Sequence, residues 1–208
     1  MTAMSSVLRQ LAAIGALSLL GACSILPKSQ PVQVYLLPAQ LTAASKAPAV
    51  SWSLRLNTPQ ASQALNSSRI AVLPQGNQFS TYAASSWSDP APRLLRNHLL
   101  NAFQADGRVR ALSTDDDNLQ ADLQLGGELQ AFQSEYHEGS VSVVLRLQAR
   151  LVDNQRRILA SQRFEVIQPV SGDAVPAVVS AFGQASDRLA AQLLQWTLAQ
   201  GAAQPKNQ

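Results

Sequence analysis

Cysteine and histidine are scarce in this chain, and their scarcity excludes several kinds of chemistry. The only cysteine among the 208 residues is Cys23, so no disulfide can form within one molecule. The two histidines, His98 and His137, lack a second ligand at the spacing that a zinc site uses. Stability must therefore come from the burial of apolar side chains and from backbone hydrogen bonds.

Motifs of the common catalytic and ligand-binding classes are also missing. The acidic run 115–118 lacks the alternate spacing and the glycine of a calcium loop, and it predicts a solvated turn. Gly126-Gly127 precedes neither a helix nor a lysine, so it is no phosphate loop. His98 is predicted to lie on a helix surface and His137 beside a hairpin turn. We therefore expect no enzymatic activity, no cofactor and no bound metal.

Long apolar runs and clustered charge are absent as well. After Cys23 no run of about 18 apolar residues occurs, so no transmembrane helix is expected there. The net charge of +3 comes from scattered basic residues, with Arg156-Arg157 as the only adjacent pair. Because no basic stripe with interleaved aromatic residues is present, we expect no nucleic-acid partner.

The first 22 residues, in contrast, have the layout of a secretory signal. A polar start is followed by an apolar stretch, 11–20, which is too short to span a bilayer, and then by Gly21 and Ala22. The order Leu20-Gly21-Ala22-Cys23 resembles the lipobox of bacterial lipoproteins. The resemblance implies cleavage before Cys23, attachment of a diacylglycerol to its thiol and acylation of its new amino group.

Lipidation of this kind would fix the whole chain to a membrane surface. Each buried methylene contributes about 0.8 kcal/mol, so two or three acyl chains make the attachment effectively permanent. We expect 1–22 to be a lipoprotein signal peptide, 23–31 a lipidated tether, 32–200 one domain, and 201–208 a disordered tail. Alternatively, the chain is an ordinary secreted protein whose cysteine happens to follow the cleavage site.

The first half of the expected domain predicts short strands and one helix. Segments with alternating or β-branched residues are typical of strands at 32–37, 51–57 and 69–73. The segment 79–83 extends or pairs with the last of these. A helix is predicted at 91–106, capped by Ser88 or Asp89 and ended by Gly107.

The second half predicts three long strands and a long helix. Apolar and polar residues alternate over roughly 11 to 13 positions in segments that begin near Leu123, Val141 and Ile158. Gly126-Gly127 predicts a bulge or a bend. A helix is predicted from Asp173 to Ala199, ending before Gly201. The predicted fold class is therefore α+β: an antiparallel sheet with a long C-terminal meander, and two main helices packed on one face.

The segment 75–90 is long, polar and carries aromatic residues, which often anchor partners. One interpretation is a docking loop that presents Tyr82 and Trp87. The other is a loop whose Trp87 simply packs on the helix that follows.

Several short motifs together resemble the ABC-type transport auxiliary lipoproteins, the paraquat-inducible protein C-like family. After the lipobox, the chain continues with Val-Tyr-Leu-Leu-Pro at 34–38, Arg-Ile-Ala-Val at 69–72 and Trp-Ser-Asp-Pro at 87–90. The long strand 143–153 and the closing helix resemble the family's C-terminal half. The stretch 57–68 departs from the family's usual sequence, so any partner contact that it makes in relatives is in doubt here.

The resemblance implies a non-catalytic subunit of an intermembrane lipid transport system. Its partners would be a mammalian-cell-entry-domain protein and the ABC permease and ATPase of the inner membrane. The chain would dock the outer-membrane end of the assembly and face the periplasm, since Ser24 resembles the outer-membrane sorting signal. Self-association into a homo-oligomer is also compatible with the family.

Two other functions stay open. The chain could be a periplasmic lipoprotein that carries a lipid in a cavity between the sheet and the helices. It could also be a hydrolase, which would require polar groups that converge in a pocket.

Overall fold

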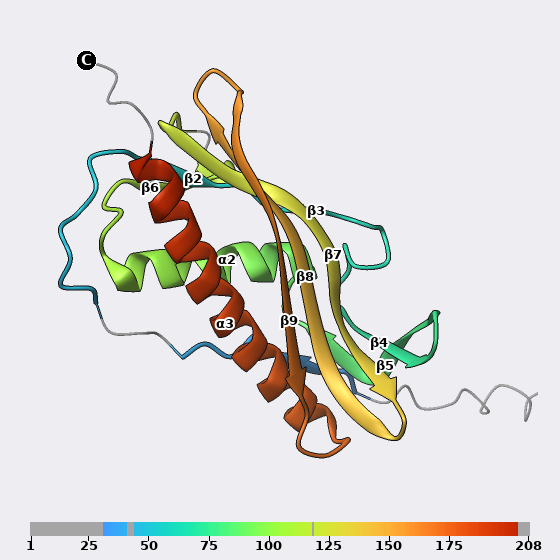
Figure 1. The fold of residues 1–208 in the computed structure, drawn as a ribbon. Helices are drawn as coiled ribbons and strands as arrows, with labels where there is room; N and C mark the ends of the chain where they lie inside the picture. Colours follow the sequence, from blue (N-terminus) through green and yellow to red (C-terminus); the bar gives the residue numbers. More distant parts are fainter. Residues whose placement is uncertain (1–30, 41–43, 118, 204–208) are drawn as a thin grey trace, which may run out of the picture. The chain divides into compact units, whose positions relative to one another are not determined.

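The computed structural model describes residues 31–40, 44–117 and 119–203. The predicted signal peptide with its Leu20-Gly21-Ala22 motif, the lipid attachment site Cys23 and the last five residues of the predicted tail lie outside the described residues. The elements, drawn in Figure 1, are β1 (Gln33–Tyr35), β2 (Leu54–Leu56), β3 (Gln60–Ala61), β4 (Arg69–Gln75), β5 (Gln78–Trp87), α2 (Ala91–Asp106), β6 (Leu112–Thr114), the 3-10 helix η2 (Asp115–Asp117), β7 (Leu123–His137), β8 (Ser140–Asp153), β9 (Ile158–Pro169) and α3 (Val175–Ala202).

The predicted C-terminal meander is confirmed. β7, β8 and β9 pair antiparallel along almost their whole length, with Leu129 opposite Leu147 and Leu147 opposite Phe164. The three strands have 15, 14 and 12 residues. In Figure 1 they run side by side as one long, curled ribbon.

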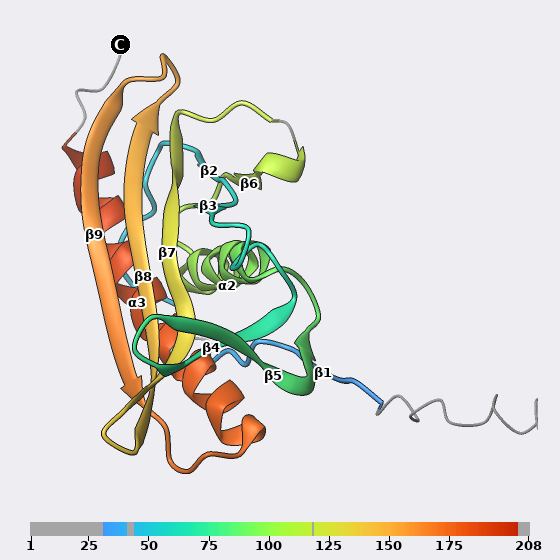
Figure 2. The same ribbon diagram turned by 90° about the vertical axis from the view of Figure 1, so that its right-hand side faces the viewer.

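The other edge of β7 makes the sheet mixed, whereas the sequence predicted an antiparallel sheet. Three short strands, β2, β3 and β4, pair with successive parts of this edge, and all of them run parallel to β7. β6 continues the sheet beyond β2, while β5 and then β1 continue it beyond β4. The sheet therefore divides on this side of β7 into two arms, which Figure 2 shows near the two ends of the strand.

Alternation along the long strands gives the sheet an apolar inner face and a polar outer face. On β8 the inner residues Val143, Leu145 and Leu147 are buried, while Arg150 on the outer face is exposed. The bulge that the sequence predicted at Gly126-Gly127 occurs instead between Leu129 and Ala131, where the register with β8 shifts. As a result Ala131 does not share the face of Leu129, although it is fully buried.

Both helices cover the inner face, as predicted. α3 packs against β8 and β9, and α2 packs against α3 and β2. Figure 2 shows α3 behind the meander, whose outer face is toward the viewer. The described residues from Val32 onward pack as a compact unit, which contains the described hydrophobic core.

Three aromatic rings mark the centre of this core. Trp87 of β5 meets Phe182 of α3 edge to face at 5.2 Å between ring centroids, and Phe182 stacks on Phe132 of β7 at 4.8 Å. All three side chains are at most 2% exposed. Since aromatic rings bury large apolar areas, this cluster stabilises the contacts between β5, β7 and α3.

The helix ends differ in detail from their predictions. α2 begins after Pro90 without a side-chain cap, so neither Ser88 nor Asp89 caps it, but Gly107 ends it in the left-handed conformation as predicted. α3 continues through Gly201 to Ala202. A side chain at position 201 would collide with the ring of Trp52, at 2.5 Å from its Cζ2 atom. This glycine therefore permits a close approach and does not stop the helix.

Candidate functional site

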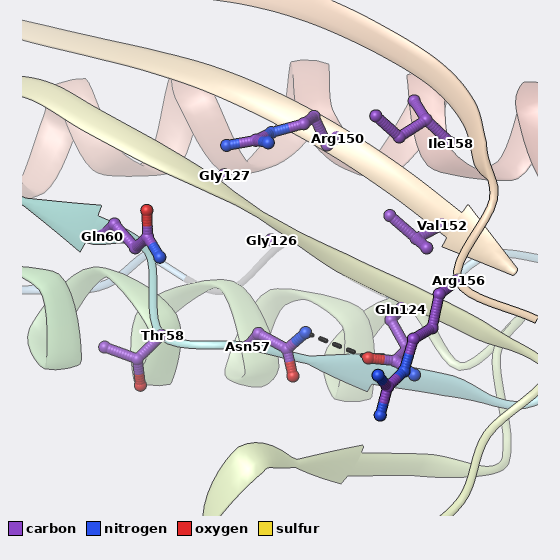
Figure 3. Close-up of a pocket in the computed structure, with 10 residues that line it drawn as sticks. All are labelled: Asn57, Thr58, Gln60, Gln124, Gly126, Gly127, Arg150, Val152, Arg156 and Ile158. Carbon is purple, nitrogen blue, oxygen red and sulfur yellow. Dashed lines mark hydrogen bonds between the residues drawn. The ribbon is translucent and has the colours of Figure 1, made fainter. Parts of the chain in front are cut away.

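An open cavity of about 420 Å³ lies on the outer face of the sheet, within the size range of small-molecule sites (Figure 3). β7 contributes Gly126 and Gly127, and the segment after β2 contributes Asn57 and Thr58. Other side chains reach the cavity from the β8–β9 hairpin and from neighbouring strands: Gln60, Gln124, Arg150, Val152, Arg156 and Ile158.

The two glycines permit close approaches, Gly126 to the side chain of Asn57 and Gly127 to the backbone of β8. A Cβ at Gly126 would lie 3.4 Å from the Cβ of Asn57. A Cβ at Gly127, where φ is +149°, would lie only 2.0 Å from the carbonyl oxygen of Gln148. The sequence analysis noticed the glycine pair but assigned it to a bulge, because only the fold brings the segment 57–60 beside it.

Charge is distributed unevenly over the outer face. At one end, Glu165 accepts from Arg146 at 2.8 Å and from Arg163 at 3.1 Å, and the hydrogen bond from Arg146 holds the pKa of Glu165 below its usual range. At the other end, Arg150 and Arg156 line the cavity, and neither forms an ion pair with any residue that the structure describes. Positive charge is therefore uncompensated at the cavity.

A buried ion pair supports the segment beside the cavity. The Arg96 guanidinium, whose side chain is 3% exposed, donates to Asp115 and Asp116, each at 2.7 Å. Asp115 also accepts from the backbone N–H and the hydroxyl of Thr58. Burial raises the pKa of Asp115, but the bonds from Thr58 and the charge of Arg96 outweigh it, and the pKa is lowered.

This ion pair corrects the predicted solvated turn at 115–118. The residues Asp115–Asp117 form η2, which holds α2 and the segment after β2 together. A run of three aspartates is usually solvated, and only the fold shows that Arg96 is within reach of two of them. Asn118 lies outside the described residues.

The predicted position of His98 on a helix surface is wrong. Its side chain is 4% exposed, and its Nε2 lies 2.9 Å from Oδ1 of Asp187 on α3. Burial lowers the pKa of His98, although the charge and hydrogen bond of Asp187 act in the opposite direction. α3 lies against the polar side of α2, so a position beside the apolar stripe becomes part of the helix contact.

Asp187 also holds the N-terminal part of the domain. Its two oxygens accept from the backbone N–H of Gln40 at 3.2 and 3.1 Å. Nearby, Gly183 leaves space for Pro38, because a Cβ at position 183 would lie 2.8 Å from the Pro38 carbonyl oxygen. We call the residues 36–40 the strap. The strap fixes the chain that follows β1 to α3.

The two predicted docking residues lie on a strand. The segment 75–90 was expected to be a loop, but most of it is β5, and Trp87 is 2% exposed. Trp87 is thus a core residue, but the rings that it meets lie on β7 and α3 and not on the helix that follows. Tyr82 is half-buried and bonds to the Ser134 hydroxyl at 2.9 Å. Burial raises the pKa of Tyr82 to about 12.

Apolar side chains are exposed instead at the edge strand β1 and its ends. Val32, Val34 and Leu36 alternate along the chain and are 58%, 64% and 75% exposed. β1 pairs only with β5 among the described strands, so its other edge has free backbone groups. The sequence shows this alternation, but not that its apolar side is left uncovered.

Potential metal ligands do not gather into a cluster in the described part of the chain. No cluster of three potential metal ligands occurs among the described residues. His137, with a side chain 90% exposed, lies 3.9 Å from Glu138 at a hairpin turn. None of the described helices combines the length and the apolar character of a membrane span.

Buried apolar side chains from the sheet and from both helices form the core between these layers. One cavity there, between Leu56, Leu99 and Leu193, has a volume of about 10 Å³. That is about the volume that one water molecule requires.

Comparison with known sequences defines the class of protein. The chain belongs to the family of ABC-type transport auxiliary lipoprotein components, whose profile matches residues 35–193. This family supplies auxiliary components to ABC-type transport systems, and it is not a known family of enzymes. Membership in a lipoprotein family implies anchoring to a membrane through lipid.

One curated relative is similar in sequence. The chain is 30% identical over 161 residues to an uncharacterized protein of Bradyrhizobium diazoefficiens. The match covers 77% of this chain but 43% of that relative, so the chain spans less than half of the relative's length.

Solved structures show the same fold. A crystal structure of a Xanthomonas campestris protein of the DUF330 family is 28% identical, with a TM-score of 0.77 over 82% of this chain and 97% of that chain. A second crystal structure, of an uncharacterized protein, is 15% identical with a TM-score of 0.63, covering 81% of this chain and 99% of that chain. The second likeness concerns the fold alone.

Proposed function

We propose that this protein is the outer-membrane docking subunit of an ABC transport system that moves phospholipids between membranes. Its partner would be a mammalian-cell-entry-domain protein, which connects it to the permease and ATPase of the inner membrane. The observation that carries the proposal is the family match over residues 35–193, in a domain where the buried Arg96 and His98 serve structural contacts. The paraquat-inducible protein C-like character of the chain is part of the same proposal.

Lipidation of Cys23 provides the attachment in this proposal. The signal peptide would be removed after Ala22, and the tether 23–31 would lead directly into β1. Because the strap is bonded to Asp187 of α3, a force on the anchored end would be transmitted to the helix layer. Ser24 would direct the lipoprotein to the outer membrane.

The exposed side of β1 is the surface that we assign to protein contacts. Val32, Val34 and Leu36 offer apolar area next to an unpaired sheet edge, a combination that favours pairing with another chain. Tyr82 is a second, weaker candidate, since its side chain is only partly buried. Contacts between copies of the chain would use the same kind of surface.

The lipid-carrier alternative has less support. A carrier needs an internal cavity that accepts acyl chains, whereas the cavity between α2, α3 and the sheet is about 10 Å³. The aromatic cluster of Trp87, Phe132 and Phe182 occupies the centre of this layer. A docking subunit has no such requirement for internal space.

Purification from detergent-solubilised membranes tests the docking role. The full chain, with a C-terminal affinity tag, should recover a mammalian-cell-entry-domain protein together with the permease. Val34→Asp should reduce the recovery, and Glu138→Asp, at an exposed turn, should leave it unchanged. Recovery of the chain without any transport component would overturn the proposal.

Labelling tests the anchor separately. Radiolabelled palmitate should be incorporated into the wild-type chain and should be absent from Cys23→Ser, which should also leave the membrane fraction. A Cys23→Ser variant that fractionates like the wild type would contradict lipid attachment at this residue.

A further inference from the structure

The cavity on the outer face has the features of an anion site. Its lining contains two arginines, several amide or hydroxyl side chains and no carboxylate. The outer-face carboxylate Glu128 lies two residues beyond Gly126 on β7, but it is not part of the lining and forms no ion pair among the described residues. The charged side chains that line the cavity are therefore both cationic.

Arg156 reaches the cavity from a strained turn. Its φ is +64°, in the left-handed region that glycine and asparagine favour. The turn is closed by the bond from the Arg156 N–H to the Asp153 carbonyl, and the Asp153 carboxylate pairs with Arg157 at 2.9 Å. Asp153 is thus bound to the neighbouring arginine, and Arg156 keeps its charge free in a conformation that a glycine would adopt more easily.

Arg150 lies near the C-terminal end of β8, opposite Gly126 of β7. In Figure 3 its side chain lies along the outer face above Gly127, and the Arg156 side chain approaches from the end of the hairpin near Gln124. The absence of side chains at the two glycines leaves the strand backbone open between these two charges.

The rim of the cavity adds an apolar part. Val152 is half-buried and Ile158 is 60% exposed, and both line the cavity beside the arginines. In Figure 3 the two guanidinium groups lie on opposite sides of the glycines, and each can bind phosphate oxygens through paired, charge-assisted hydrogen bonds. An adjoining aliphatic surface suits a ligand in which the phosphate is joined to a glycerol or hydrocarbon part.

We propose that this cavity, with Arg150 and Arg156 as its cationic groups, binds the phosphate of a phosphoglyceride-type ligand. The phosphate could belong to a phospholipid headgroup at a membrane surface or to a soluble glycerol phosphate. The site differs from the internal cavity of a lipid carrier, and it does not depend on the proposed docking role.

The experiment uses residues 24–208, which contain the whole compact unit described above. Its two arms are binding to phosphatidylcholine vesicles with and without phosphatidylglycerol, and calorimetric titration with sn-glycerol 3-phosphate. The variant Arg150→Gln/Arg156→Gln should weaken binding at least about tenfold in the arm that contains the natural source, since each lost charged bond contributes more than a neutral one. The matched control is Arg69→Gln/Arg110→Gln, which removes the same charge from exposed positions outside the cavity, and it should change binding less than about twofold.

The two arms and the control decide the proposal. Loss of vesicle binding alone identifies a lipid headgroup, and loss of glycerol phosphate binding alone identifies a soluble ester. If both double variants lose binding to the same extent, the ligand is attracted by net charge alone. That result overturns the proposed site. Absence of saturable binding in both arms overturns it as well.

A third variant separates binding from folding. Arg156→Gly removes the charge and relieves the left-handed backbone, so the urea midpoint should rise or stay unchanged while phosphate binding falls. Unaltered binding in this variant would contradict a role for Arg156. None of these results depends on the recovery of a transport partner in the membrane purification.

Discussion

Arg96 and His98 lie two residues apart on α2, and both are buried, yet they attach the helix to different parts of the molecule by different chemistry. Arg96 is held by Asp115 and Asp116 beside the outer cavity. His98 meets Asp187 on α3, which also binds the strap. The first contact supports the segment 57–60, and the second supports the end of the chain that leads toward the tether.

The two contacts differ above all in how charge is maintained. An arginine stays protonated at every physiological pH, so its contact with two carboxylates is permanently ionic. Burial lowers the pKa of His98, which favours the neutral imidazole as the partner of Asp187. Two polar contacts on one helix should therefore respond differently to mutation and to pH.

The largest loss of stability is expected when a carboxylate partner of Arg96 is removed. Asp115→Ala removes the hydrogen bonds to Thr58 and leaves the buried guanidinium of Arg96 with only Asp116. We expect the free energy of unfolding to fall by about 2–4 kcal/mol, since an undercompensated buried charge adds to the lost bonds. Urea unfolding at pH 7 measures this change.

A double-mutant cycle with Arg96→Met sharpens this prediction. In that background the buried charge is gone, so Asp115→Ala should cost clearly less than in the wild type. Arg93→Ala is the control, because its side chain is 51% exposed and pairs with Asp116 at the surface. Equal costs for Asp115→Ala in the two backgrounds would show that Arg96 does not depend on Asp115.

A smaller loss of stability is expected when Asp187, the partner of His98, is replaced. Asp187→Ala deprives both His98 and the Gln40 N–H of a partner, and we expect about 1–3 kcal/mol. Proteolysis near the strap should become faster as well, because the residues 36–40 lose their bonds to α3. Asp173→Ala, at an exposed position before α3, should change neither property.

The periodicity of the sequence predicted the helix that carries Arg96 and His98, but it did not predict the carboxylates that these two residues contact. The helix 91–106 and its apolar stripe follow from sequence spacing, and Leu95, Leu99 and Phe103 are buried as that stripe requires. Arg96 and His98 lie beside the stripe, where the pattern predicts an exposed side chain. Their carboxylate partners are 19 and 89 positions away (115 minus 96 and 187 minus 98), and no local rule identifies such pairs.

The sheet also shows that local contacts can be predicted from the sequence and that distant ones cannot. The meander was predictable because consecutive strands with alternating residues pair through short turns. The arms of the sheet were not, since β2, β3 and β4 pair in parallel with β7 across long stretches of sequence. The outer cavity lies where one of these non-local pairings brings Asn57 beside Gly126, so neither the cavity nor its free arginines could be inferred from the sequence.

The smallest effect at neutral pH, and the most specific one, concerns His98 itself. His98→Gln keeps a hydrogen-bond donor near Asp187, so at pH 7 we expect a loss of about 1 kcal/mol or less. Because the pKa of His98 is lowered in the folded protein, the unfolded chain binds more protons below its ordinary value of 6.5. The stability of the wild type should therefore be complete above that value and should decline as the pH falls from 7 to 5.

This decline should be absent in His98→Gln and retained in His137→Gln, whose histidine is 90% exposed. The hydrogen bond from Arg108 and the contacts of Thr58 and Arg96 lower the pKa values of Asp106 and Asp115, so these carboxylates stay ionised over the same interval. Urea unfolding at several pH values measures the slope for all three proteins. A slope that survives in His98→Gln would mean that another group is responsible, and that the contact with Asp187 is no more sensitive to pH than that of Arg96.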